Sequence, residues 1–199
     1  MTTGLATAST GISMMLTRHP GVVTDAGTLP ARYPTSKRSH ADGFSIPVAI
    51  SVRGYLRAPV DPMDADGNGT LRVPEPASHV GWWVLGARPG APTGTVLLTG
   101  HVDSWTSGLG VFAQLSRIPL GSVVDIEDSN GRDHSYVIRA RRTYEKQKLP
   151  HDLFTDSGVP RLALVTCTGP YDRTRQTYTR NLVLYAEPQT GPGSMAKTY

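Results

Sequence analysis

Short apolar runs, separated by residues that favour turns, restrict the fold of this chain more than any other feature of its sequence. Glycine occurs 21 times and proline 16 times among 199 residues, so few stretches could form a long uninterrupted helix. In the first run Ile46, Val48, Ile50 and Val52 alternate with smaller residues, as a half-buried strand requires. The expected strands are residues 46–52, 82–85, 95–99, 123–127, 136–144, 162–167 and 181–186.

A closed β-barrel is the architecture that many short strands favour. Asn130-Gly131 predicts a hairpin turn between residues 123–127 and 136–144. Residues 110–120 differ, because the spacing of their apolar side chains predicts one short helix that ends before Pro119. These side chains belong to Val111, Phe112, Leu115 and Ile118. We therefore predict a mainly β protein with short helices and loops.

One domain is expected to account for most of the chain, since 38% apolar residues suffice for a core of ordinary size. Residues 1–43 have the composition of a tail or linker, and we expect this tail to lie across the domain and cover a groove. Residues 44–188 form the expected domain and 189–199 a C-terminal tail. No stretch approaches the roughly 18 apolar residues of a membrane span. The N-terminus also lacks the pattern of a signal peptide, so the chain as given is expected to be soluble.

The charge of the chain excludes little. Lys and Arg exceed Asp and Glu by 20 to 16, a formal charge of +4 with a pI near 9.4, which permits weak attraction to anionic polymers. The densest basic stretch, residues 139–148, falls in or just after an expected strand and is typical of a solvated face, so nucleic-acid binding is not predicted. A single cysteine allows no intrachain disulfide and no cysteine cluster for a metal.

Three reactive side chains stand at the ends of expected strands. Cys167 follows an apolar run and precedes Gly169-Pro170, His101 follows another run, and Arg180 directly precedes a third. An imidazole can form or stabilise a thiolate and then protonate a leaving amine. A guanidinium can face the oxyanion of a tetrahedral intermediate. Together these groups predict an acyl-transfer site.

Two other interpretations remain open on the residues alone. A cysteine hydrolase on another fold would use the same Cys-His pair but deliver the acyl group to water. In a non-catalytic β-barrel interaction module, Cys167 would pack as a small hydrophobe and Arg180 would be a surface charge.

The wording and order of these segments resemble the sortase family. Its members carry a His in a Thr-Gly-His segment, a Thr-Cys at the end of a strand, and an Arg about a dozen residues later. Here these are His101, Thr166-Cys167 and Arg180. The surrounding sequence is most similar to the class F branch of actinobacterial sortases. Examples are the segments Gly100-His101-Val102-Asp103-Ser104 and Thr168-Gly169-Pro170-Tyr171-Asp172. The resemblance covers about residues 44–188, which would be the catalytic domain.

The resemblance implies an eight-stranded sortase barrel on the outer face of the cell membrane of a Gram-positive bacterium. Such an enzyme would cut a Leu-Pro-x-Thr-Gly-like sorting signal of surface proteins between Thr and Gly, and hold the acyl group on Cys167 as a thioester. An amine acceptor, such as a peptidoglycan precursor or a pilin lysine, would then take the acyl group. His101 would be the acid/base, Arg180 would steady substrate and oxyanion, and Thr166 with the Thr168 backbone amide would line the oxyanion site. No cofactor is required, and the membrane anchor usual in the family is not visible in this sequence.

Asp103 lies two residues after His101, so both side chains would share one face of an extended chain. Its carboxylate could orient the imidazole, although a turn-capping role is the simpler expectation. The other histidines show no paired ligand spacing.

A possible calcium loop begins at Asp64. With Asp66, Asn68 and Glu75 as ligands and Gly69 at the sixth place, it fits the twelve-position EF-hand pattern. Pro62, Pro74 and Pro76 forbid the flanking helices of an EF-hand. We therefore favour a turn-rich loop and keep calcium binding as the alternative.

Overall fold

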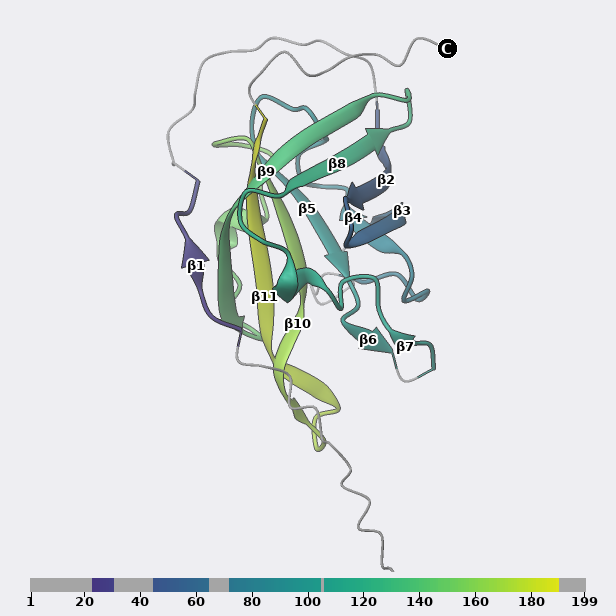
Figure 1. Ribbon diagram of the computed structural model, residues 1–199, viewed down its shortest axis with the longest axis vertical. Coiled ribbons are helices and arrows are strands. Elements are labelled where there is room, and N and C mark those ends of the chain that lie inside the picture. Colours follow the sequence, from purple (N-terminus) through teal and green to yellow (C-terminus); the bar gives the residue numbers. More distant parts are fainter. Residues whose placement is uncertain (1–22, 31–44, 65–71, 105, 190–199) are drawn as a thin grey trace, which may run out of the picture.

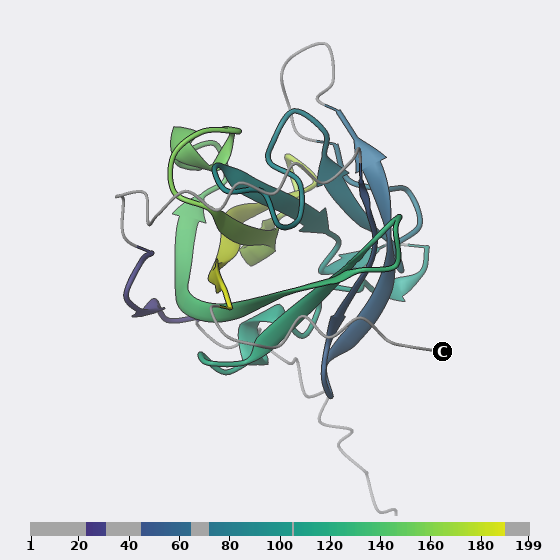
Figure 2. The same cartoon turned by 90° about the horizontal axis from the view of Figure 1, so that it is seen from above.

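The computed structural model describes residues 23–30, 45–64, 72–104 and 106–189. Eight of the strands form a closed barrel, whose arrangement can be followed in Figures 1 and 2. Around the barrel the strands follow the order β9, β11, β10, β5, β4, β3, β2 and β8, and β8 pairs with β9 to close it. The bounds of the barrel strands are β2 Pro47–Val52, β3 Leu56–Met63, β4 Val80–Trp83, β5 Thr95–Gly100, β8 Val123–Asp128, β9 Asp133–Glu145, β10 Arg161–Asp172 and β11 Thr177–Pro188. The predicted mainly β barrel is confirmed.

Two parallel pairings set which strand ends meet. β10 runs parallel to β5, and β3 runs parallel to β4, whereas the other barrel neighbours are antiparallel. A separate two-stranded hairpin, β6 (Asp103–Ser104) with β7 (Gly108–Leu109), follows β5. The carboxyl ends of β5 and β10 therefore lie at the same end of the barrel, the lower end in Figure 1, together with β6 and β7.

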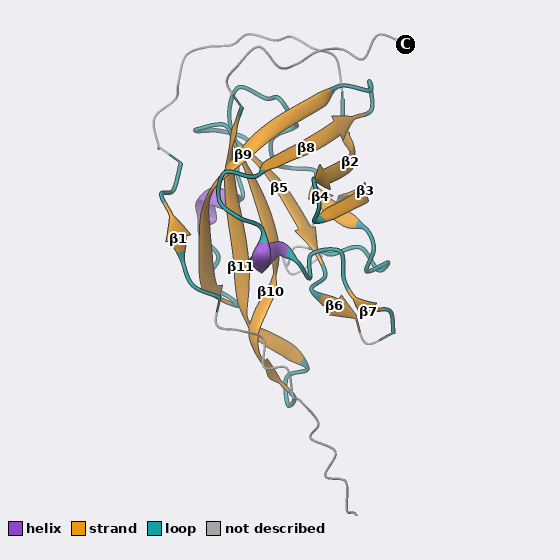
Figure 3. Ribbon diagram, viewed as in Figure 1, coloured by secondary structure: helices purple, strands orange, loops and turns teal. Residues whose placement is uncertain are grey.

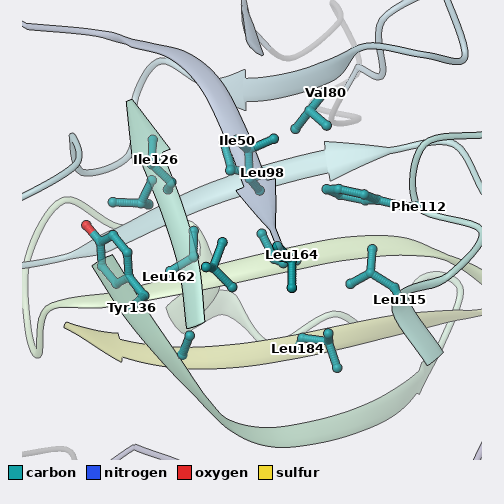
Figure 4. Packing of buried hydrophobic residues seen from close by; sticks show 14 of the residues in the cluster. Ile50, Val80, Leu98, Phe112, Leu115, Ile126, Tyr136, Leu162, Leu164 and Leu184 are labelled. Atoms are coloured by element: carbon teal, nitrogen blue, oxygen red, sulfur yellow. The ribbon is translucent and has the colours of Figure 1, made fainter. Parts of the chain in front are cut away.

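The barrel interior is filled by aliphatic and aromatic side chains, most of which come from the strands (Figure 4). Leu98, Leu162, Leu164 and Leu184 project into this core, and each is 0% exposed. A second cluster, with Leu97, Ala163, Val165 and Val183 among its members, lies on the other face of the same strands. Since β5, β10 and β11 are buried on both faces, they read as continuous apolar runs in the sequence.

The expected helix in residues 110–120 is only a single 3-10 turn, η1 Leu115–Arg117, drawn as a short helix in Figure 3. A second 3-10 turn is η2 His151–Leu153. Backbone bonds span three residues, as from Ile118 N to Leu115 O at 3.3 Å, because Pro119 forces Ile118 into an extended conformation. The helical spacing was nevertheless informative, since Phe112, Leu115 and Ile118 are all buried in the barrel core.

Two other local expectations need correction. Val48 is 37% exposed because a register shift between Pro47 and Ala49 interrupts the alternation in β2. β3 was missed, since its two prolines, Pro59 and Pro62, are depleted in strands. The turn at Asn130-Gly131 is confirmed, with Gly131 at φ 74° between β8 and β9.

Part of the N-terminal segment pairs with the barrel. β1 (Ala26–Gly27) lies along the edge of β9, and the Arg142 guanidinium donates to both carbonyls of β1 at 2.6 and 2.7 Å. Gly27 has φ +76°, and a Cβ there would meet the Arg139 carbonyl. The described part of the predicted tail therefore covers a sheet edge, beside β9 in Figure 1. No helix among the described residues is long and apolar enough to cross a membrane.

Asp128 organises the β8–β9 hairpin from a buried position. Its carboxylate, 2% exposed, accepts hydrogen bonds from the backbone of Asn130 (2.9 Å) and Arg132 (3.1 Å) and from His134 Nε2 (2.8 Å). Burial alone would raise the pKa of Asp128, but these bonds outweigh burial and hold that pKa below its ordinary value.

Replacing Asp128 by alanine is expected to lower the free energy of unfolding by about 2–4 kcal/mol, because the donors lose a buried acceptor. Urea unfolding near neutral pH measures this loss. Asp128→Asn should lose less near neutral pH. The stabilisation from ionised Asp128 is present above the carboxyl pKa of the unfolded chain, about 4, and is lost as the pH falls through the lower pKa of the folded state.

Asp125→Ala is the matched control, since Asp125 on the same strand accepts a single hydroxyl bond, from Ser135 at 2.6 Å. It should cost about 1 kcal/mol or less. Equal losses for the Asp125 and Asp128 variants would contradict a special role for the buried carboxylate.

Candidate active site

The parallel pair β5–β10 places His101 and Cys167 at one rim of the barrel. Thr99 pairs with Val165, and His101 and Cys167 lie two residues further along their chains. The buried Thr166 hydroxyl donates to the Gly100 carbonyl at 2.7 Å and keeps the two chains aligned beyond the last paired residues. Because side chains alternate along extended chains, His101 and Cys167 leave on the same side.

Cys167 and Arg180 stand where the regular ladder between β10 and β11 ends. Cys167 pairs with Asn181, Thr168 pairs with Arg180, and the register shifts immediately afterwards. Gly169, at φ +81°, adopts the backbone conformation that this irregularity requires. The fold thus brings all three residues singled out in the sequence to the same end of the barrel.

Arg180 is free to meet a ligand. Its side chain is exposed, and none of the residues that the structure describes forms a hydrogen bond or ion pair with it. Its positive charge helps to hold the pKa of Glu145, its register partner, below the ordinary value, after the larger contribution of the Lys148 hydrogen bond. A guanidinium in this state can donate hydrogen bonds to a carbonyl oxygen or an oxyanion.

His101 does not bond to Cys167 in this structure. Its Nε2 lies 2.9 Å from the Pro74 carbonyl, and a carbonyl oxygen only accepts, so Nε2 donates in this contact and Nδ1 is the ring nitrogen that remains for proton transfer. The imidazole is half-buried. It is therefore oriented by the backbone of the segment before β4 and not by a carboxylate.

The group that does contact the thiol is Lys146, which the sequence did not single out. Its Nζ lies 2.8 Å from Cys167 Sγ. Lys146 directly follows β9 and belongs to the basic stretch 139–148 that was interpreted as a solvated face. The only indication of Lys146 in the sequence was its position just after an expected strand, since the other reactive residues also lie at strand ends.

Asp103 contacts Tyr178, a second residue that the sequence analysis missed. The Tyr178 hydroxyl donates a hydrogen bond to Asp103 Oδ2, and its ring packs edge-on against Tyr171 with centroids 5.3 Å apart. Burial, then the Asp103 bond and the negative charge of Asp103, raise the pKa of Tyr178 above its ordinary value. This bond ties the β6–β7 hairpin to the β10–β11 hairpin beside Cys167.

The remaining site residues are placed as follows. Thr166 is 4% exposed and its hydroxyl is occupied by the Gly100 carbonyl, whereas Thr168 is half-buried opposite Arg180. Of the calcium-loop candidates, Asp66 and Asn68 lie outside the described residues, and Asp64 and Glu75 flank that gap. Within the described ranges no three or more His, Cys, Asp or Glu side chains gather where they could hold a metal ion.

The fold is an eight-stranded barrel that carries a cysteine, a histidine and an exposed arginine at one rim. A sequence profile of the sortase domain matches residues 53–189. The chain therefore belongs to the sortase family.

Solved sortase structures share this fold. The Streptococcus agalactiae sortase C1 in its complex with MTSET matches with a TM-score of 0.55 and 20% identity, over 74% of this chain and 69% of that one. Sortase C1 from Streptococcus suis matches at TM-score 0.55 and 18% identity, over 76% of each chain. Sortase C-1 from Actinomyces oris matches at 0.55 and 21%, over 72% and 73%. No curated protein sequence matched the chain.

Proposed function

We propose that this chain is a cysteine transpeptidase that cleaves a Leu-Pro-x-Thr-Gly-like sorting signal between Thr and Gly and transfers the Thr acyl group to an amine. The observation that carries the proposal is the position of Cys167, His101 and Arg180 at the same end of the barrel in a chain of the sortase family. A thiol, an imidazole and a guanidinium supply a nucleophile, a proton carrier and a fixed positive charge.

In the first half-reaction the Cys167 thiolate attacks the carbonyl carbon of the Thr residue, and a C–S bond forms. Negative charge develops on the carbonyl oxygen, where Arg180 and the Thr168 backbone N–H would stabilise it. Protonated His101 then gives its proton to the Gly nitrogen as the C–N bond breaks. The products are a thioester on Cys167 and a peptide with a free amino terminus.

In the second half-reaction an acceptor amine attacks the thioester while neutral His101 takes a proton from it. The C–S bond breaks, the new amide forms, and Cys167 returns as a thiolate beside protonated His101. Water can replace the amine and gives a free carboxylate. Thr166 supports this chemistry indirectly, because its hydroxyl aligns the segments that carry His101 and Cys167.

The finer assignments rest on the sequence resemblance. The text around His101 and Cys167 favours the class F branch of actinobacterial sortases. On that basis we infer an enzyme at the outer face of the cell membrane, with sorting-signal proteins as donors and a peptidoglycan precursor or a pilin lysine as acceptor. The proposed reaction requires no cofactor.

Intact-mass spectrometry with a Leu-Pro-x-Thr-Gly peptide tests the function. We expect a thioacyl adduct on Cys167 and, when a glycine amine is added, a transfer product that replaces the hydrolysis product. Adduct formation followed by hydrolysis alone, at the same rate with any amine, would favour a cysteine hydrolase. No adduct with any such peptide would favour a non-catalytic module.

A further inference from the structure

The Cys167 sulfur has a lysine against it. Lys146 Nζ lies 2.8 Å from Cys167 Sγ, and both side chains are half-buried. An ammonium is a compact point charge with three donors, and a hydrogen bond from it to a thiolate is charge-assisted and so stronger than one to a neutral thiol. This contact therefore favours the ionised form of the nucleophile.

The backbone of Lys146 is fixed on both sides. Its N–H donates to the Thr179 carbonyl at 3.0 Å, and its carbonyl accepts from Asn181 Nδ2 at 2.9 Å. Asn181 is 5% exposed and is the register partner of Cys167. Cys167, Asn181 and Lys146 thus form a continuous set across β10, β11 and the end of β9. The buried Asn181 side chain therefore fixes the backbone of Lys146 beside Cys167 through the fold itself.

The other charged groups near the sulfur have different partners or none. The Asp103 carboxylate accepts the Tyr178 hydroxyl, and the Glu145 carboxylate pairs with Lys148 at 2.7 Å. Arg180 is exposed and faces Glu145 across the strand pair. His101 is bound to the Pro74 carbonyl. Within the described part of the chain no carboxylate pairs with Lys146, so its charge is directed at Cys167.

We propose that Lys146 is a fourth catalytic residue, whose ammonium holds Cys167 as a thiolate before substrate arrives. The thiol proton leaves to solvent, Lys146 stays protonated, and His101 keeps its separate task of proton transfer to the leaving amine. The catalytic role of Lys146 rests on the proposed transpeptidase function, but its effect on the Cys167 thiol can be tested without a peptide.

The test is alkylation of Cys167 by iodoacetamide, followed by intact mass across the range from about pH 6 to about pH 9. The variant is Lys146→Met, which keeps the length of the side chain and removes its charge. At neutral pH we expect alkylation on the order of tenfold slower than in the original chain. The pH of half-maximal rate should rise by about one unit, and the rates should converge at high pH.

Matched variants separate charge from structure. Lys146→Arg should recover much of the neutral-pH rate, since it restores a cation. Lys148→Met removes a lysine that is 73% exposed two residues away, and should stay within about twofold of the original rate.

Two outcomes would overturn the proposal. One is alkylation of Lys146→Met at the original rate at neutral pH. The other is slowing by the same factor at every pH, which would show a change of access and not of ionisation. Because iodoacetamide needs no sorting peptide, either result can be read even if no Leu-Pro-x-Thr-Gly peptide reacts. If no sorting peptide reacts but the pH of half-maximal alkylation rises in Lys146→Met as expected, the transpeptidase proposal is disproved and the lysine–thiolate pair is supported.

Discussion

Cys167→Ala is expected to abolish the thioacyl adduct and to lower the rate of amine transfer by at least about 10⁴-fold. The reason is covalent, since loss of the nucleophile leaves only binding and oxyanion stabilisation. Cys167 is the only cysteine of the chain, so no other thiol can substitute. Initial rates of product formation, measured by chromatography with a sorting peptide and a glycine amine, check this result.

The fold of that variant should be unaffected. Cys167 is half-buried at the end of the regular ladder, outside the residues that fill the barrel core, so the melting temperature should stay within a few degrees of the original. Cys167→Ser is the companion variant, and its hydroxyl should leave at most a trace of activity, because it does not ionise near neutral pH. Amine-dependent transfer at more than a hundredth of the original rate in Cys167→Ala would disprove the assignment of the nucleophile.

Arg180→Ala is the second change with a large expected effect. Removal of one oxyanion donor typically lowers kcat by about 10²–10³-fold, and loss of a peptide contact should raise KM as well. Arg180→Lys keeps a charge but not the planar fork of donors, so we expect it to recover about tenfold of the lost kcat. Steady-state kinetics with the same peptide and amine give both constants.

Arg175→Ala is the control for the Arg180 variants. Arg175 lies in the same hairpin, and its side chain is 82% exposed and pairs with Asp172 at 3.9 Å. It should leave kcat within about twofold of the original value. Iodoacetamide alkylation of Cys167 in Arg180→Ala should also stay near normal, since the thiol contacts Lys146 and not Arg180. Equal losses in Arg175→Ala and Arg180→Ala would mean that only overall charge matters.

Much of the barrel could be predicted because apolar runs and turn residues act locally. The runs around Leu98, Leu164 and Leu184 became β5, β10 and β11, and Asn130-Gly131 forms the hairpin turn. The failures have local causes too. Pro59 and Pro62 concealed β3, which pairs with β2 and β4 in spite of them. Val48 was predicted to be buried because the alternation of apolar residues along the sequence does not show the register shift between Pro47 and Ala49.

The candidate site was only partly visible in the sequence. Strand ends and the sortase resemblance together single out Cys167, His101 and Arg180, and the parallel register of β5 with β10 places the first two at the same rim. Lys146 was not predictable, because its contact with Cys167 spans 21 residues and depends on β11 lying between β9 and β10. The Tyr178–Asp103 bond spans 75 residues and joins two hairpins.

The sequence by itself determined the mainly β class and the approximate strands, because periodicity and turn chemistry are properties of neighbouring residues. The three residues proposed for catalysis came from strand-end positions together with the resemblance to the sortase family. Tertiary structure alone decided which polar groups meet. In the folded chain His101 bonds to the Pro74 carbonyl, Asp103 bonds to Tyr178, and the Cys167 thiol contacts Lys146. Such partners are fixed by the order and register of the strands, and those follow from the packing of the whole barrel.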